Sequence, residues 1–172
     1  VMARFSHKLA IAPTASISII CGGTSAGIEP IPANIYTHKT LSGSFSVKNP
    51  FLEEVLEKTG NNKPGIWASI LEHEGSVQHL ECLTEQEKLV FRTAFEIDQR
   101  WLIEHAADRA PFICQAQSLN IFLPADVHKR DLHQIHMMAW KRGVKSLYYC
   151  RSLSIQRAEN VAGEALTAAP LG

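Results

Sequence analysis

Short runs of strand-forming residues alternate with helical patterns along the chain, and turn residues separate them. Strand-forming residues on both sides of Ser42-Gly43 predict a β-hairpin over Tyr36–Lys48. Helices are expected over 51–58, 97–109 and 130–142, and Pro64-Gly65 leads into a further element over 66–74. Strands are also expected over 118–123 and 145–150, and 5–12 reads as a strand or the approach to one.

Several helix boundaries carry residues that cap or stop a helix. Thr84, with Glu87 three residues later, has the pattern of a capping box ahead of an apolar run. Asn49-Pro50 opens one helix, and Gly143 closes the helix before the last strand. The stretch 118–150 reads as strand, helix and strand, which suits two parallel strands joined by a crossover. These patterns predict an α/β fold.

The composition fits a globular domain and excludes several other classes of protein. At 172 residues with 45% hydrophobic content, the chain is long enough to bury a domain-sized core. Lys+Arg and Asp+Glu both number 17, so no net charge directs the chain to nucleic acid or to an acidic membrane. The longest apolar run is far shorter than a membrane span, and no signal peptide is visible. We expect a cytoplasmic protein with reduced thiols.

Cysteines and histidines give no metal-binding pattern. The four cysteines, which show no CxxC pairing or zinc spacing, are Cys21, Cys82, Cys114 and Cys150. The closest histidines, which have no carboxylate at a persuasive ligand offset, are His128, His133 and His136. We therefore expect no metal site, and we expect Cys150 to pack in the interior, as cysteine often does.

A first chemical pattern lies where the chain passes from a predicted strand into a helix. Pro13 suits the first turn of a helix, and Thr14 and Ser16 place hydroxyl groups near that turn. A helix start presents free backbone N–H groups, and the segment 9–28 holds no acidic residue that would repel an anion. The pattern therefore fits an anion site. The alternative is a plain capped helix that ends at Gly22-Gly23.

A second chemical pattern is the pair Tyr148-Tyr149 in the last predicted strand. Tyrosine can carry an unpaired electron after losing an electron and a proton, although two tyrosines in a strand also fit plain packing. Adjacent residues of a regular strand point to opposite faces. Contact between the two rings therefore requires the backbone to depart from a flat strand, at a strand end or a bend.

Four motifs, in collinear order, resemble the C-terminal part of the large subunit of class I ribonucleotide reductases. The motifs are 11–30, 36–45, 115–120 and 139–149. The first matches the family signature Pro-Thr-Ala/Gly-Ser-Ile-Ser followed by Gly-Thr-Ser-x-Gly-Ile-Glu-Pro, with one extra glycine. The resemblance covers most of Ala3 to Arg157. It implies the C-terminal portion of a ten-stranded α/β barrel, with peripheral helices and a hairpin, over 1–157. A flexible tail is expected over 158–172.

The same resemblance implies roles for both chemical patterns. The loop that would bind the substrate phosphates, through backbone N–H groups and hydroxyls, consists of Pro13, Thr14, Ala15, Ser16 and Ile17. Tyr149 would receive an oxidising equivalent from the small subunit, and Tyr148 would pass it to a cysteine in the active site. That cysteine would become a thiyl radical and abstract a hydrogen from the ribose, while two other cysteines supply the reducing electrons.

Parts of the family pattern have no counterpart here. None of the four cysteines aligns with a catalytic one, and the C-terminal cysteine pair and the effector sites are also missing. We therefore expect a fragment or one piece of a split large subunit, inactive without the N-terminal remainder and prone to self-association. No cofactor is expected in this chain. The small subunit would carry a dimetal-tyrosyl radical cofactor, and thioredoxin or glutaredoxin would reduce the whole enzyme, whose substrate is a ribonucleotide.

Two other interpretations stay open. A vitamin B12-dependent class II reductase shares the phosphate-loop signature but needs no tyrosine relay, so Tyr148-Tyr149 favours class I. A truncated, non-catalytic relic would fold or bind without reacting. Retention of both the Pro13–Ile17 loop and the tyrosine pair argues against a relic.

Overall fold

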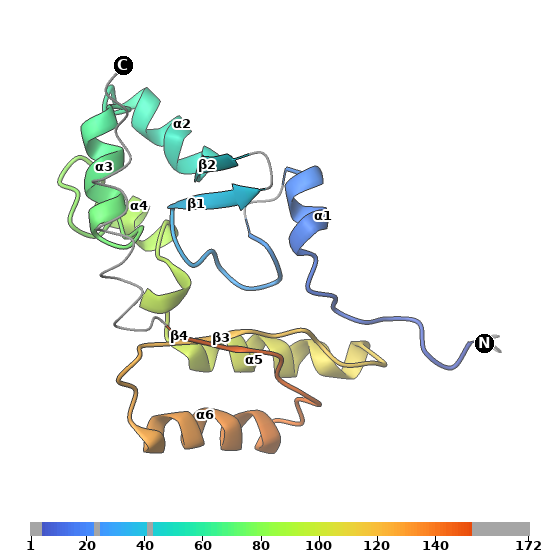
Figure 1. The fold of residues 1–172 in the computed structure, drawn as a ribbon. Coiled ribbons are helices and arrows are strands. Elements are labelled where there is room, and N and C mark those ends of the chain that lie inside the picture. Colours follow the sequence, from blue (N-terminus) through green and yellow to red (C-terminus); the bar gives the residue numbers. More distant parts are fainter. Residues whose placement is uncertain (1–4, 23–24, 41–42, 153–172) are drawn as a thin grey trace. The chain divides into compact units, whose positions relative to one another are not determined.

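The computed structural model describes residues 5–22, 25–40 and 43–152. The chain divides into two compact units, and Figure 1 shows the elements of each. Thr14–Ile97 forms the first, which we call the inserted unit. Val1–Pro13 and Asp98–Gly172 together form the second, which we call the terminal unit. The expected tail over 158–172 lies outside the described residues.

The inserted unit contains a hairpin and a series of short helices. Its elements are α1 (Ala15–Ile20), β1 (Ile35–Thr40), β2 (Gly43–Lys48), α2 (Pro50–Lys58), α3 (Pro64–Glu72), α4 (Glu85–Val90) and the short helix η1 (Ala94–Glu96). Strands β1 and β2 pair antiparallel, with Ile35 opposite Lys48 and Thr40 opposite Gly43. The predicted hairpin is therefore confirmed.

Local capping explains where the helices of this unit begin. The Asn49 side chain accepts a hydrogen bond from the Phe51 amide at 3.1 Å, and Pro50 occupies the first helical position of α2. At α4, the Glu87 amide donates to Thr84 Oγ1 at 3.3 Å, and the Thr84 amide donates to Glu87 Oε2 at 2.7 Å. Both predicted caps are confirmed.

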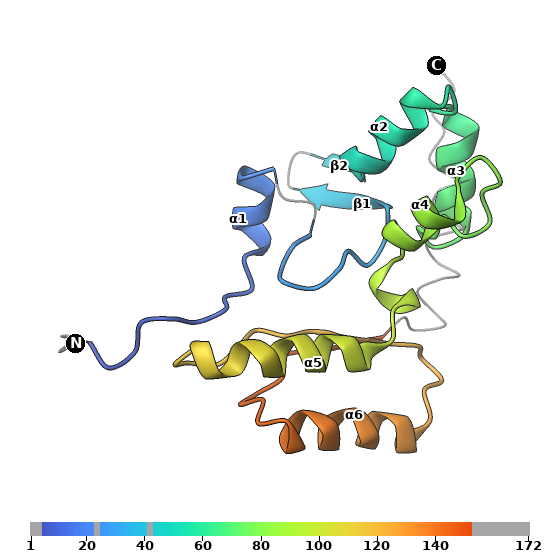
Figure 2. The ribbon, with the colours of Figure 1, turned by 180° about the vertical axis from the view of Figure 1, so that it is seen from behind.

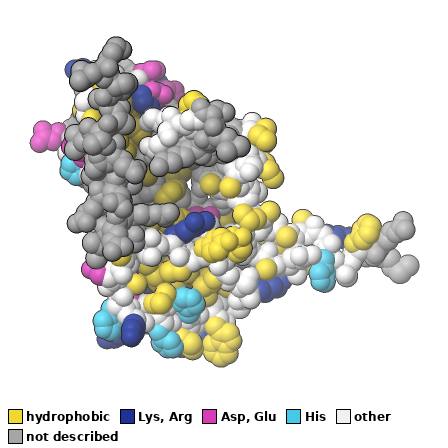
Figure 3. All heavy atoms as spheres, in the orientation of Figure 1, with side chains coloured by type: hydrophobic (Ala, Val, Ile, Leu, Met, Phe, Trp, Pro, Cys, Tyr) yellow, Lys and Arg dark blue, Asp and Glu magenta, His cyan; other side chains and the backbone are white. Residues whose placement is uncertain are grey.

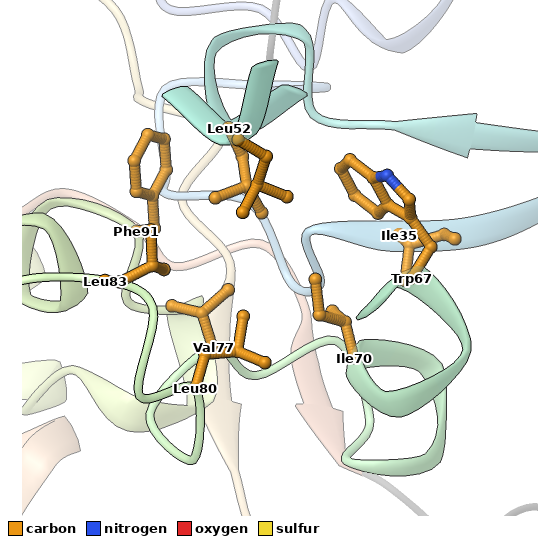
Figure 4. Close-up of a cluster of buried hydrophobic side chains, with 9 residues drawn as sticks. Ile35, Leu52, Trp67, Ile70, Val77, Leu80, Leu83 and Phe91 are labelled. Carbon is orange, nitrogen blue, oxygen red and sulfur yellow. The ribbon is translucent and has the colours of Figure 1, made fainter. Parts of the chain in front are cut away.

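A cluster of buried hydrophobic side chains forms the core of the inserted unit (Figure 4). It consists of Ile35, Leu52, Leu56, Trp67, Ile70, Val77, Leu80, Leu83 and Phe91. The members come from the hairpin, from α2 and α3, and from the segments that follow α3. Burial of these side chains supplies the main free energy that holds the short helices together, because helices of this length are marginal alone.

One buried polar residue, Asn34, ties together backbone segments around this core. Its side-chain Nδ2 donates to the carbonyls of Gly75 at 3.0 Å and Phe91 at 2.8 Å, and its Oδ1 accepts from Asn49 Nδ2 at 2.9 Å. Gly75 has a φ of +85°, and a Cβ added there would lie 2.4 Å from Ala33 Cβ. Only glycine therefore fits against the Asn34 segment at this position.

The terminal unit contains two long helices and a pair of parallel strands. Its elements are α5 (Gln99–Arg109), the short helix η2 (Ala110–Phe112), β3 (Ile121–Leu123), α6 (Lys129–Lys141) and β4 (Cys150–Ser152). Strands β3 and β4 pair in parallel, with Ile121 opposite Cys150, and α6 lies between them in sequence. The predicted crossover is confirmed. In Figures 1 and 2, α5 and α6 run side by side within this unit.

Three strand boundaries differ from the prediction. The segment 5–12, read as a strand or the approach to one, forms no named strand, but Ile11 makes a parallel bridge with Gln117 and the Leu9 carbonyl accepts the Gln115 amide at 3.0 Å. Nearby, the amides of Lys8 and Leu9 donate to the Cys114 sulfur rather than to the carbonyls of a partner strand.

The other two differences concern the parallel pair. The strand expected over 118–123 is limited to Ile121–Leu123, and the strand expected over 145–150 begins only at Cys150. The Lys145 ammonium group donates to the carbonyls of three consecutive residues, 113–115, which holds the chain there as a loop. The α/β content is confirmed. The described residues form two two-stranded sheets, and the ten-stranded barrel stays a prediction.

Large hydrophobic side chains reach the surface in both units. Hydrophobic groups, yellow in Figure 3, are visible on the face shown. The most exposed ones among the described residues are Ile20 (84%), Phe112 (77%), Trp140 (72%), Val90 (70%) and Phe5 (69%). Such side chains form candidate contact surfaces for further protein.

Candidate functional site

The segment expected to bind phosphate forms the start of α1. The helix begins at Ala15, and Thr14 before it has a φ of 56°, in the left-handed region that branched residues rarely adopt. The Thr14 carbonyl accepts the Ser18 amide at 2.8 Å. The Thr14 hydroxyl donates to the Ala26 carbonyl at 3.4 Å and does not cap the helix. Pro13 therefore precedes the helix cap instead of occupying the first turn.

This segment is open to solvent. Thr14 is half-buried, and the exposed residues of the segment are Pro13, Ala15, Ser16 and Ile17. The first turn of α1 contains no acidic side chain, and the first amides of a helix have no acceptor within it. The helix ends as expected, with Gly22 at a φ of +68°, while Gly23 lies outside the described residues. The segment thus presents backbone N–H groups to solvent with no nearby negative side chain on the helix itself.

The tyrosine pair lies immediately before β4. The Tyr148 amide donates to the Leu119 carbonyl at 2.9 Å, and the Tyr149 carbonyl accepts the Ile121 amide at 2.9 Å. The two ring centroids are 4.0 Å apart, with 54° between the ring planes. The rings therefore contact each other at the end of a strand, which confirms the expected departure from a flat strand.

The hydroxyl groups of the pair are also linked. Hydrogen bonding to Tyr149 raises the pKa of Tyr148 above its ordinary value. A hydrogen bond that raises this pKa favours the protonated phenol of Tyr148. Both side chains are 50% exposed. The pair therefore combines ring contact, an interaction between the two hydroxyl groups and an open side.

A third side chain, Arg151, completes this cluster. The Arg151 guanidinium carbon lies 4.9 Å from the centroid of the Tyr149 ring. This distance is typical of a cation–π contact. The sequence contains the arginine but offers no signal for the contact, because the contact depends on where β4 begins.

Cys114 is a chemically distinctive residue that its sequence context does not reveal. The amides of Lys8 and Leu9 each donate to Cys114 Sγ at 3.0 Å. These backbone hydrogen bonds, from Leu9 first and then Lys8, lower the pKa of the Cys114 thiol, and the positive charge of Lys145 adds to the effect. No local motif could indicate it, since the donors lie more than a hundred positions away.

The remaining cysteines do not build a further site. Cys150 is exposed, so the expectation that it packs in the interior is wrong. It begins the short strand β4, every residue of which is exposed. Among residues 5–22, 25–40 and 43–152, no group of three or more His, Cys, Asp or Glu could hold a metal ion. In that same part of the chain, no helix has the length and apolar character that crossing a membrane requires.

The two predicted sites belong to different units. Thr14–Ile17 lies in the inserted unit, whereas Pro13 and the tyrosine pair lie in the terminal unit. The structure brings Tyr148, Tyr149 and Arg151 together.

The sequence and the fold of this chain are similar to those of known proteins. The family model of the ribonucleotide reductase barrel domain matches residues 3–150. The ribonucleoside-diphosphate reductase large subunit of Invertebrate iridescent virus 6 is 51% identical over 162 residues, covering 92% of this chain and 17% of the viral protein. The ribonucleoside-diphosphate reductase subunit alpha of Chlamydia trachomatis is 38% identical over 156 residues, covering 91% of this chain and 15% of that protein.

A solved structure gives the same result. The class Id ribonucleotide reductase alpha subunit of Actinobacillus ureae matches with a TM-score of 0.75 and 43% identity, covering 86% of this chain and 26% of that chain. The chain thus spans well under a third of the length of each of these relatives. The resemblance drawn from the four motifs is confirmed. The chain therefore belongs to the ribonucleotide reductase large-subunit family, in which it corresponds to part of the barrel domain.

Proposed function

We propose that this chain is the part of a class I ribonucleoside-diphosphate reductase large subunit that supplies the substrate-phosphate loop and the tyrosine relay. The whole enzyme would reduce ribonucleotides to deoxyribonucleotides by radical chemistry. The observation that carries the proposal is the contact between the rings of Tyr148 and Tyr149, 4.0 Å apart by their centroids. The two relatives cited are ribonucleoside-diphosphate reductase subunits, which supports the reaction type.

The proposed relay is a transfer of one electron and one proton. A Tyr149 phenoxyl radical, formed by an oxidising equivalent from the small subunit, takes an electron from Tyr148 across the ring contact. The proton follows from the Tyr148 O–H to the Tyr149 oxygen along the hydrogen bond that raises the Tyr148 pKa. Tyr149 is restored as a phenol, and Tyr148 becomes the radical that oxidises the active-site cysteine.

The proposed phosphate site uses the exposed start of α1. Pro13 to Ile17 carry no negative charge, and the first amides of the helix are free of intrahelical acceptors. The positive end of the helix dipole adds attraction for a phosphate. Thr14, at the N-cap of α1, has a left-handed backbone that turns the chain into the helix.

The remaining parts of the reaction require partners. The N-terminal part of the large subunit would supply the catalytic cysteines. The small subunit would hold the dimetal-tyrosyl radical cofactor, and thioredoxin or glutaredoxin would return the electrons. We place this assembly in the cytoplasm, where thiols stay reduced. In this scheme the chain itself binds the nucleotide but no metal.

A vitamin B12-dependent class II reductase is the second candidate. It would use the same phosphate loop and generate its radical beside the substrate. The contacting, solvent-open tyrosine pair favours class I, because a relay from a separate subunit needs a redox-active side chain at an accessible surface.

Co-expression with the N-terminal part and a small subunit, followed by an assay of deoxyribonucleotide formation, tests the proposal. Tyr149→Phe keeps the ring but removes the hydroxyl, so activity should be lost. Tyr36→Phe, in the hairpin strand β1, is the matched control and should keep activity. Activity that survives Tyr149→Phe would remove the relay and favour the B12-dependent interpretation. An assembled but inactive parent enzyme would favour a relic.

A further inference from the structure

Arg151 is held in place by the strand that follows the tyrosine pair. It lies opposite Phe122 in the parallel ladder of β3 and β4, and Phe122 is buried. Arg151 comes two residues after Tyr149, in the middle of β4. Its guanidinium carbon lies 4.9 Å from the centroid of the Tyr149 ring.

The Arg151 charge has no competing partner in the described part of the chain. Across residues 5–22, 25–40 and 43–152, no carboxylate lies within ion-pair distance of it. Arg100 and Arg142, by contrast, bind Asp98 and Glu104. The observed contact of the Arg151 guanidinium is thus an aromatic ring that the proposed function makes redox-active.

A cation on the face of a tyrosine ring acts on the energy of oxidising that ring. The guanidinium is attracted by the negative face of the electron-rich phenol, and this attraction weakens when the ring loses an electron. The contact therefore makes Tyr149 harder to oxidise than it would be alone. Hydrogen bonding to Tyr149 raises the pKa of Tyr148, and the Arg151 charge opposes that only as the smallest contribution.

We propose that Arg151 is a positioning residue that biases the relay inward, by destabilising the radical on Tyr149 relative to the radical on Tyr148. This inference rests on the proposed relay. The step it affects is the one described above, in which Tyr149 gains an electron and a proton and Tyr148 loses both. Arg151 itself neither gains nor loses either. An oxidising equivalent that reaches Tyr149 is thereby driven toward the active site.

The ratio of radicals at the two positions measures this bias. In the assembled enzyme, a fluorinated tyrosine in place of Tyr148 gives a fluorine splitting in the electron paramagnetic resonance spectrum. That splitting distinguishes the radical at Tyr148 from the radical at Tyr149. Arg151→Gln should shift the ratio toward Tyr149 by about two- to fivefold, the factor typical of an exposed cation–π contact. Arg151→Lys, which keeps a cation, should return the ratio toward that of the parent enzyme.

Arg100→Gln is the matched control, because it removes an equal charge that binds Asp98 and no tyrosine. It should leave the ratio unchanged. An equal ratio in the parent and in Arg151→Gln overturns the role of Arg151 while leaving the relay intact, as does an equal shift in Arg100→Gln. Absence of any radical at both positions in the parent overturns the relay and this inference together.

Discussion

At the scale of single residues, the hydroxyl of Tyr149 controls the acidity of its neighbour. Hydrogen bonding to Tyr149 is the largest cause of the raised pKa of Tyr148. Tyr149→Phe removes the acceptor oxygen and keeps the ring. The pKa of Tyr148 should therefore fall back toward the value of a free tyrosine, about 10. Ultraviolet titration of the phenolate measures this change.

The titration is carried out in a chain that already carries Tyr36→Phe, so that Tyr149→Phe gives a double variant. The chain has three tyrosines, so in the double variant only Tyr148 absorbs as a phenolate. Arg100→Gln in the same background controls for a general change in charge, because Arg100 binds Asp98. A midpoint for Tyr148 that stays above the ordinary value after Tyr149→Phe would contradict the hydrogen-bonded arrangement.

Residues whose environment is local were predictable, and residues whose environment is assembled from distant segments were not. The capping box of Thr84 and Glu87 can be predicted from the sequence, because both partners lie within one helical turn. Cys114 receives its amide donors from positions 8 and 9, which no window of sequence contains. The left-handed backbone of Thr14 was equally invisible, since glycine is the usual residue there.

At the scale of elements, the turn after α3 depends on one glycine. Gly75 has a φ of +85°, and an added Cβ would lie 2.4 Å from Ala33 Cβ and 3.0 Å from the Asn34 amide nitrogen. Gly75→Ala should lower the free energy of unfolding by at least about 2 kcal/mol, from backbone strain and overpacking together. Denaturant unfolding measures the loss.

A second glycine provides the control for this substitution. Gly65 lies in α3 with nothing near its would-be Cβ. Gly65→Ala should therefore leave stability unchanged or raise it by up to about 1 kcal/mol, because alanine favours helix. Equal losses from both substitutions would show that the close approach of Ala33 to Gly75 does not exist in solution.

The same turn should make stability depend on pH. The His79 ring stacks on His73 at 3.7 Å, and its Nε2 hydrogen-bonds Ser69 Oγ at 2.8 Å. Burial is the main cause of the lowered pKa of His79, and the charges of His73 and Lys88 add to it. The folded state thus binds a proton at His79 less readily than the unfolded state, whose histidine pKa is about 6.5.

The contribution of His79 to stability is complete above about pH 6.5 and is lost as the pH falls toward the lowered folded pKa. Denaturation midpoints measured across this window should decline on acidification. His79→Gln should flatten the decline, whereas His133→Gln, an exposed residue of α6, should not. An identical pH profile for His79→Gln and the parent would refute the effect.

Some boundaries of helices and strands could be predicted from the sequence and others could not. The hairpin β1–β2 and the helices α2 and α4 follow from turn residues and caps next to them. The strands β3 and β4 are shorter than expected, and the segment before β4 is tied instead by the Lys145 side chain to three carbonyls that are distant in sequence. The tyrosine pair was predictable as a residue pattern. Its position at the end of a strand, outside β4, was predictable as well, because two adjacent rings cannot touch within a flat strand.

At the scale of the whole molecule, exposed apolar groups are candidate surfaces for contact with further protein. Ile20, Phe112 and Trp140 are all more than 70% exposed, and the chain spans only 17% of the viral large subunit. We predict that the isolated chain self-associates and that co-expression with the N-terminal part suppresses this. Sedimentation at increasing protein concentration measures it. A strictly monomeric isolated chain would show that these side chains need no cover.

The division of the chain into an inserted and a terminal unit sets an order of events during synthesis. Every residue of Thr14–Ile97 is available once position 97 has left the ribosome, so this unit can complete its contacts early. The Ile11–Gln117 bridge and the bond from Tyr148 to Leu119 must wait for later residues. A chain whose translation stops before Tyr148 would therefore hold the contacts within Thr14–Ile97, but neither the tyrosine pair nor the pairing of β3 with β4.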